Sequence, residues 1–126
     1  MAVARAALDE LYGRLASAGF AHLQPASAVV FQHIRPGGSS LDELARLGGM
    51  TPAAVEEQVS ALETAGYVVR VQDGDQRLVE LTAHGREAVS FGLGVLAEIE
   101  QQWRTALGDT AFEAFAYALA RLNLAR

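Results

Sequence analysis

The feature that most constrains the fold of this chain is a change in hydrophobic period near Gly66. Before it, apolar residues recur with the 3.6-residue period of one buried helical face. After it, the period changes to two, and residues 67–71 and 77–81 favour two short strands. Asp73-Gly74 between the two runs is a strong signal for a hairpin turn. The sequence therefore predicts a helix that leads directly into a β-hairpin, and the buried face of that helix carries Val55, Val59 and Leu62.

Two helices are expected in the first forty residues. The first has apolar residues at i, i+3, i+4 and i+7, and Gly19 is expected to terminate it. The second begins near Pro25, a favourable first-turn residue, and stops at the helix-breaking Arg35-Pro36-Gly37-Gly38. The apolar residues that define the first helix are Leu8, Leu11, Tyr12 and Leu15.

The next two helices carry clear start signals. Ser40 and Glu43 have the spacing of a capping box, in which Ser40 is the N-cap and Glu43 reaches back, so a short helix is expected over 41–47. Thr51 caps the following helix, and Pro52 occupies a first-turn position where its missing N–H is not needed. Gly66 provides the left-handed C-terminal cap.

A long helix is expected from about residue 83 to 107, after a cap at Thr82. It carries two apolar stripes, whereas a surface helix needs only one. An isologous contact with a second copy of the chain would bury the additional stripe, so we expect a homodimer. The first stripe comprises Val89, Leu93, Leu96, Trp103 and Leu107, the second comprises Phe91, Val95, Ile99 and Ala106, and a last helix adds Phe112, Phe115, Leu119 and Leu122.

This order of elements predicts a mainly α fold with a small β-hairpin wing. A short helix joined through a glycine-containing turn to a second helix is a helix-turn-helix unit, and a hairpin directly after it makes the winged version. We expect a winged helix-turn-helix head for DNA binding over residues 25–88 and a helical dimerisation region, or arm, over 1–24 and 89–126.

The reading head also resembles that of the MarR-type winged-helix regulators. Three stretches are each similar to a part of that family's pattern. They are Ser40 to Val55, residues 62–68, and Asp75-Gln76-Arg77 with residues 81–86. The resemblance covers roughly residues 25–105. It implies a homodimer on a pseudopalindromic DNA operator and transcriptional repression that a small ligand or oxidation often relieves. Because the chain has no cysteine, a thiol-based oxidation switch is excluded.

The charge distribution opposes non-specific DNA binding. The chain has a net charge of −5, and all ten basic residues are arginines. Residues 39–90 hold nine acids and four arginines, which accounts for the whole excess of 9 − 4 = 5 negative charges. Since non-specific affinity comes from neutralised phosphates, such a head starts at a disadvantage. The alternative is a winged-helix dimer that does not bind DNA and serves as a protein-interaction module.

Double-stranded DNA is expected to contact the capped helix and the hairpin. Glu56 and Glu57 either read cytosine N4 or form a solvated helix face. Arg77 either contacts DNA or pairs structurally with Asp75, and the two roles are compatible. The family that the chain resembles commonly has a further arginine at the position of Gln76. The expected contacts are Thr51, Pro52, Ala53, Glu56, Glu57, Gln58 and Ser60 on the helix, and Arg70, Gln72, Asp75, Gln76 and Arg77 on the hairpin.

A small aromatic or apolar effector is expected to bind near aromatic residues of the helices, although such residues also serve as core or interface. The three histidines lack a metal-ligand spacing, and Ser39-Ser40 has no neighbouring base, so we expect no enzyme, no metal and no cofactor. No apolar run could span a membrane, and charges come too early for a secretory signal, so a cytoplasmic location is expected. The candidate effector contacts are Tyr12, Phe31, His33, Phe91 and Trp103.

Overall fold

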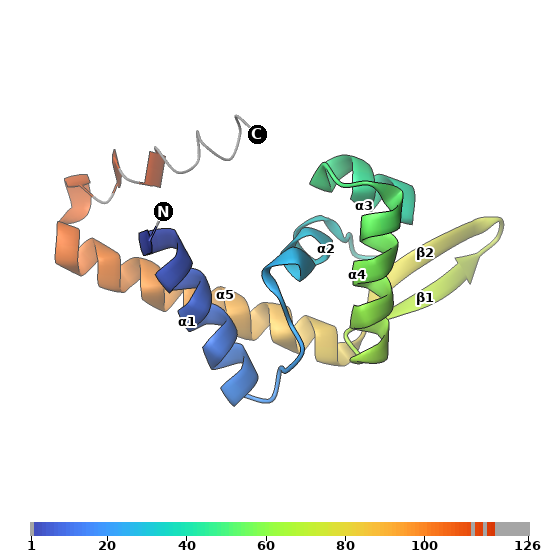
Figure 1. The fold of residues 1–126 in the computed structure, drawn as a ribbon, viewed down its shortest axis with the longest axis horizontal. Coiled ribbons are helices and arrows are strands. Elements are labelled where there is room, and N and C mark those ends of the chain that lie inside the picture. Colours follow the sequence, from blue (N-terminus) through green and yellow to red (C-terminus); the bar gives the residue numbers. More distant parts are fainter. Residues whose placement is uncertain (1, 112, 115, 118–126) are drawn as a thin grey trace. The chain divides into compact units, whose positions relative to one another are not determined.

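The elements of the first of two compact units, Met1–Gly92, follow the order that the hydrophobic patterns predict (Figure 1). The mainly helical winged-helix fold with a small hairpin is thereby confirmed. Helix α5 begins in this unit and continues into the second unit, Leu93–Arg126. In the computed structural model, the elements are α1 (Ala2–Ser17), a 3₁₀ turn (Pro25–Ser27), α2 (Ala28–His33), α3 (Leu41–Gly48), α4 (Pro52–Thr64), β1 (Val68–Asp73), β2 (Gln76–Leu81) and α5 (Ala83–Leu107).

The structure describes residues 2–111, 113, 114, 116 and 117, with side chains from Arg5 onward. After a break at Gly108, the described residues of the expected last helix are helical. The apolar residues that we expect to define its buried face, Phe112, Phe115, Leu119 and Leu122, lie outside the described residues.

Side-chain caps define where α3 and α4 begin. The Ser40 hydroxyl accepts a hydrogen bond from the Glu43 N–H at 3.1 Å, and the Thr51 hydroxyl accepts one from the Ala54 N–H at 3.1 Å. The expected return contact from the Glu43 carboxylate is wrong, because this carboxylate pairs with the Arg35 guanidinium at 2.6 Å. A charge-assisted bond is stronger than a bond to a neutral backbone N–H, so only half of the capping box forms.

The hairpin turn lies one residue later than Asp73-Gly74 predicts. Strands β1 and β2 pair Asp73 with Gln76, so Gly74 and Asp75 are the two central turn residues. Gly74 has a φ of +59°, whereas Asp75 is not among the described residues with positive φ. Glycine at the first central position followed by a negative φ is the type II′ turn, whose twist matches that of the strands. Glycine takes the one position that requires a positive φ.

The core of the first unit is centred on the inner face of α4. Burying an aliphatic side chain stabilises a fold by roughly 1.5–3 kcal/mol, so this face is the main attachment of α4. Tyr67 extends the core, because its ring stacks on His84 at 4.7 Å and its hydroxyl donates to the Ala21 carbonyl at 2.6 Å. These contacts join the loop before α2 and the start of α5 to the hairpin. The fully buried aliphatic residues are Val30, Leu44, Val55, Val59, Leu62 and Val79.

The two apolar stripes of α5 differ in exposure. Val95 and Ile99, of one stripe, are buried. Leu93, Leu96 and Leu107, of the other, are 62%, 45% and 50% exposed. In a single copy of the chain, therefore, Val95 and Ile99 are covered, whereas Leu93, Leu96 and Leu107 present apolar surface to solvent.

Gly85 marks the closest approach of α5 to the hairpin, and its replacement tests this packing. A Cβ at Gly85 would lie well inside van der Waals contact with the Tyr67 carbonyl oxygen, a backbone atom. We expect Gly85→Ala to lower the free energy of unfolding, measured in urea, by about 1–3 kcal/mol. Gly13→Ala is the control: its Cβ would meet nothing within 4 Å in α1, and we expect a gain of about 0.5–1 kcal/mol. Equal stability of the parent and Gly85→Ala would contradict the close approach.

Candidate nucleic-acid interface

The outward face of α4 is exposed and carries most of the predicted helix contacts. Since Val55 and Val59 face the core, the opposite side of the helix presents Ala53, Glu57 and Ser60. Thr51 and Pro52 are exposed at the N-terminus of α4, where the Thr51 hydroxyl is used as the cap. Gln58 is half-buried and lies nearer the core than the other predicted contacts. The structure therefore gathers these residues on one face, with Gln58 at its edge.

One face of the hairpin turns toward α4. Strand pairing places Arg70 opposite Val79 and Gln72 opposite Arg77. Because side chains alternate along a strand, Arg70, Gln72 and Arg77 share the face of the buried Val79. Asp75 and Gln76 are exposed at the tip. The predicted hairpin contacts thus divide into a group that faces α4 and a pair at the tip.

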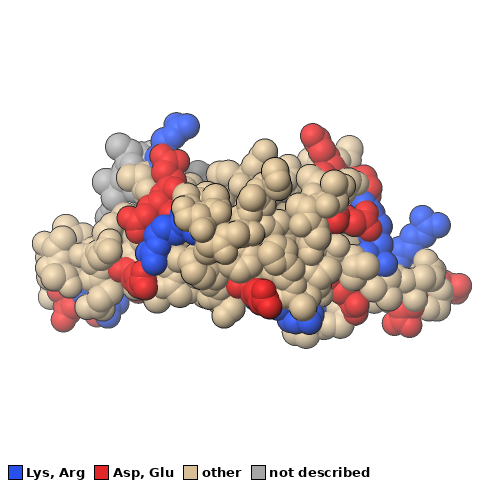
Figure 2. Space-filling model, turned by 90° about the horizontal axis from the view of Figure 1, so that it is seen from below, with Lys and Arg blue, Asp and Glu red and all other residues tan. Residues whose placement is uncertain are grey.

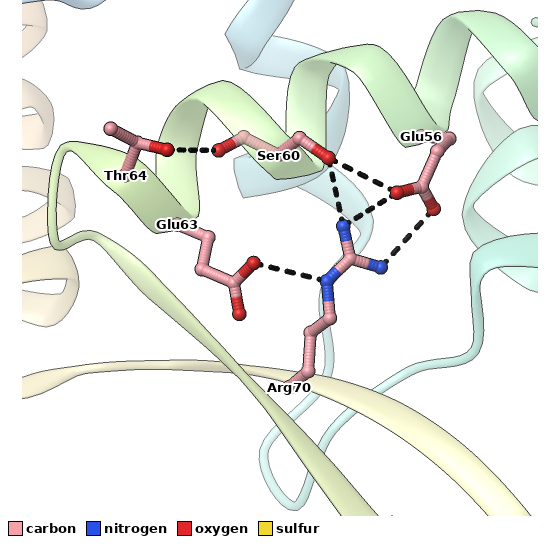
Figure 3. Close-up of polar contacts among 5 residues, drawn as sticks. All are labelled: Glu56, Ser60, Glu63, Thr64 and Arg70. Atoms are coloured by element: carbon pink, nitrogen blue, oxygen red, sulfur yellow. Dashed lines mark hydrogen bonds and ion pairs between the residues drawn. The ribbon is translucent and has the colours of Figure 1, made fainter.

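Arg70 joins the hairpin to α4 through three side chains (Figure 3). Its two terminal nitrogens contact both carboxylate oxygens of Glu56, at 2.7 and 3.1 Å, as a bidentate pair. One of them also donates to the Ser60 hydroxyl at 3.0 Å, and the Nε–H donates to Glu63 at 3.2 Å. Glu56, Ser60 and Glu63 recur at i, i+4 and i+7, the spacing of one helix face. The Arg70 cluster is the name used below for these four side chains.

The cluster changes the charge that α4 presents. Hydrogen bonds from Arg70 first, and from Ser60 second, lower the pKa of the Glu56 carboxyl, so Glu56 is ionised at neutral pH. The pair with Glu56 in turn raises the pKa of Arg70. Glu57, by contrast, makes no ion pair or hydrogen bond with another side chain in the part of the chain that the structure describes. The two neighbouring acids therefore have different environments, and only Glu56 is neutralised within the chain.

Acidic and basic side chains are intermixed on the surface, without one large basic patch on the face drawn in Figure 2. Arg77 is exposed, and within the described residues its guanidinium makes no ion pair with Asp75 or another acid. The structural pair with Asp75 is therefore not formed, and the DNA contact of Arg77 stays a prediction.

Two hollows border this face. One, of about 510 Å³, separates α4 from the hairpin and is called the α4–hairpin hollow below. The other, of about 450 Å³, lies beside the start of α3 and shares Leu41, Arg77 and Leu78 with it. Arg77 therefore borders both spaces. The α4–hairpin hollow is lined by Leu41, Glu56, Arg70, Val71, Gln72, Arg77, Leu78 and Val79.

Glu63 belongs to the Arg70 cluster but is absent from the contacts expected from sequence. Its signal was present, because Glu63 stands seven residues after Glu56 and seven before Arg70. Acids at i and i+7 lie on one face of a helix, and a basic residue on the strand that follows can pair with both acids. That relation needs the strand direction, which the sequence alone leaves open.

The candidate effector residues contribute to packing. Phe91 lies 5.6 Å from Phe20, and Phe31 meets Tyr67 edge-on at 6.2 Å, both between ring centroids. Tyr12 is half-buried, and burial raises the pKa of its hydroxyl. His33 is also half-buried, and Trp103 lies in the second unit. None of the five lines either hollow, so their role in ligand binding stays a prediction.

The described residues contain neither a metal-ligand cluster nor a membrane-spanning helix. Within them, no three histidine, aspartate or glutamate side chains come together as a metal site would require. No described helix combines the length and the apolar character needed to cross a membrane.

The Arg70 cluster predicts a specific pH dependence. Because the native pKa of Glu56 is lowered, its pair stabilises the fold above the unfolded pKa and is lost as pH falls through the lowered value. We expect Arg70→Gln to raise the pKa of Glu56, as measured by NMR titration of the carboxyl group. The free energy of unfolding should then fall less steeply between about pH 6 and pH 3 than it does in the parent. Glu63→Gln, which leaves the bidentate pair intact, should keep the pKa of Glu56 low. An unchanged Glu56 titration in Arg70→Gln would contradict the pair.

Comparison with known proteins identifies the same fold. A family model described as the DprA winged helix domain matches residues 16–74. No curated protein sequence matches the chain.

Solved structures match almost the whole chain. A probable transcriptional regulator from Pseudomonas aeruginosa is 27% identical, with a TM-score of 0.68 over 95% of this chain and 93% of the other. MarR is 22% identical, with a TM-score of 0.71 over 96% and 87%. The MepR–DNA complex of Staphylococcus aureus is 18% identical, with a TM-score of 0.73 over 98% and 91%. The chain therefore has the winged-helix fold of the MarR-type transcriptional regulators, which confirms the resemblance drawn from its sequence.

Proposed function

We propose that this protein is a DNA-binding transcriptional regulator whose α4 enters the major groove while the hairpin reaches the groove beside it. The observation that carries the proposal is the exposed face of α4 next to a hairpin face with Arg77, which makes no ion pair within the described residues. An α-helix with its side chains is roughly 10–12 Å across, which fits the major groove of about 12 Å width. The likeness in fold to MepR, which was solved in complex with DNA, supports DNA binding.

We infer further that two copies of the chain act together as a homodimer. Leu93, Leu96 and Leu107 are exposed on α5, and Leu8 is 42% exposed on α1. Apolar side chains repeated along one stripe are typical of an interface between subunits. A two-fold dimer would carry two heads and match a pseudopalindromic operator.

The mode of regulation follows from the resemblance to MarR-type regulators. We propose that the dimer represses transcription by occupying its operator and that a small aromatic or apolar ligand releases it. Tyr12, Phe31, His33, Phe91 and Trp103 remain the predicted contacts of that ligand.

The alternative function, a protein-interaction module, is favoured by the acidic head. Residues 39–90 carry five more acids than arginines, and one of those arginines is held by Glu56. Salt dependence separates the two functions, because binding to phosphates releases counterions and an interaction module has no phosphates to bind.

Arg77→Ala tests the DNA-binding function directly. Fluorescence anisotropy with random duplex DNA should give the parent a negative slope of log affinity against log salt concentration. We expect Arg77→Ala to reduce the slope by about 1 per head and to leave the melting temperature nearly unchanged. Arg14→Ala, on α1 away from the hairpin (Figure 1), is the control and should retain the parent slope. A parent without a salt slope would favour the interaction module.

The dimer is tested by sedimentation velocity at micromolar concentration. We expect the parent to sediment as a dimer and Leu93→Glu to sediment as a monomer, because a charge would be buried in the apolar contact. Leu47→Glu places the same charge on α3, where Leu47 is 42% exposed, and should remain dimeric. A monomeric parent would refute the homodimer.

A further inference from the structure

Under the proposed function, the DNA backbone would pass the α4–hairpin hollow. Adjacent major and minor grooves are separated by one sugar–phosphate strand. A head with its helix in one groove and its hairpin in the next must therefore place this strand between the two elements. The hollow is bordered by Glu56 on α4 and by Arg70 and Arg77 on the hairpin. The space that faces phosphates thus holds two cations and one carboxylate.

The two arginines occupy diagonal positions on one hairpin face. Arg77 pairs with Gln72, which is two residues from Arg70, and diagonal neighbours of this kind are within reach of long side chains. Like charges at such positions would repel each other unless one is neutralised. Glu56 and Glu63 neutralise Arg70, whereas Arg77 has no acidic partner in the described part of the chain.

The contact between Arg70 and Glu56 uses the part of the guanidinium that phosphate would use. Arginine binds carboxylates and phosphates through the same two-pronged arrangement of parallel N–H donors. In this chain both prongs end on Glu56, at 2.7 and 3.1 Å. Glu63 contacts only Nε, so it leaves the two terminal nitrogens untouched.

We propose that Glu56 is an internal competitor for phosphate, which holds Arg70 away from the DNA backbone. This inference rests on the proposed DNA-binding function. Arg77 is then the cation of the hollow that contacts the backbone, and each head forgoes one phosphate contact. The consequence is lower affinity for DNA of any sequence, so that binding depends more on the contacts that read bases.

The test compares two variants that remove the same charge from the same cluster. Glu56→Gln removes the carboxylate that holds the terminal nitrogens of Arg70, whereas Glu63→Gln, the matched control, leaves that carboxylate in place. With random duplex DNA, we expect Glu56→Gln to bind more tightly and to steepen the salt slope by about 0.9 per head. Its advantage over the parent should then shrink about 3.5-fold per head between roughly 50 and 200 mM salt. Glu63→Gln should keep the parent slope.

Arg70→Gln completes a double-mutant cycle. In the parent it should leave the salt slope unchanged, because Arg70 makes no phosphate contact there. In the Glu56→Gln background it should restore the parent slope. Circular dichroism melting verifies that each variant is folded. A second measurement uses the unaltered protein: on addition of DNA, the side-chain ¹⁵N–¹H signal of Arg70 should stay in place while that of Arg77 shifts.

Each outcome separates this inference from the proposed function. Three results would overturn the competitor role while leaving DNA binding in place. These are a salt slope in Glu56→Gln equal to that of the parent, an equal steepening of the slope in Glu63→Gln, and a DNA-induced shift of the Arg70 signal. If neither the parent nor any variant binds DNA, the proposed function fails together with the inference. Binding that appears only in Glu56→Gln and disappears with Arg70→Gln would support both.

Discussion

The rest of the head depends on burial of one face of α4. Val55, Val59 and Leu62 are almost completely removed from solvent, and this attachment determines which residues point outward. The caps at both ends add definition, because Thr51 starts the helix and Gly66 lets the chain turn into β1. Because the helix is held by its inner face, Ala53 and Glu57 remain exposed on the outer one, whereas the Ser60 hydroxyl is engaged by Arg70 and Glu56. The same burial brings Glu56 and Glu63 over the hairpin.

Electrostatics then modify the surface that packing has created. Without Arg70, the flank of α4 over the hairpin would present two unpaired carboxylates. The cluster reduces that local charge from −2 to −1 and joins helix and hairpin without burying an ion pair, since its charged side chains are 33% to 49% exposed. Such exposure limits its contribution to stability, because water screens the attraction. The effect of the cluster on phosphate binding does not depend on its contribution to stability. A guanidinium that is paired with a carboxylate contributes little to phosphate affinity.

Local signals were sufficient to predict the fold but not the geometry of the interface. The helix boundaries, the caps at Ser40 and Thr51 and the hairpin follow from short-range patterns, which act within a few residues. The missing capping-box contact of Glu43 and the Arg70 cluster depend on residues 7 to 14 positions away, brought close only by folding. The turn lies one residue later than expected because Asp73 pairs with Gln76, which makes Gly74 the first central turn residue rather than the second. Long-range pairing of charges is therefore the part that sequence reasoning did not reach.

The restriction of basic residues to arginine adds a last consequence. An ammonium would meet Glu56 as a point charge, whereas the planar guanidinium engages both carboxylate oxygens and still donates to Ser60 and Glu63. One cation can thus hold two acids and a hydroxyl on a single helix face. In a dimer the cluster occurs twice, so each phosphate contact withheld per head is withheld twice on the operator. Under the proposed function, affinity for arbitrary DNA would fall with two contacts, while the exposed Ala53 and Glu57, which lie outside the Arg70 cluster, would keep their environment. An acidic head of this kind would then favour discrimination between DNA sequences over strength of binding.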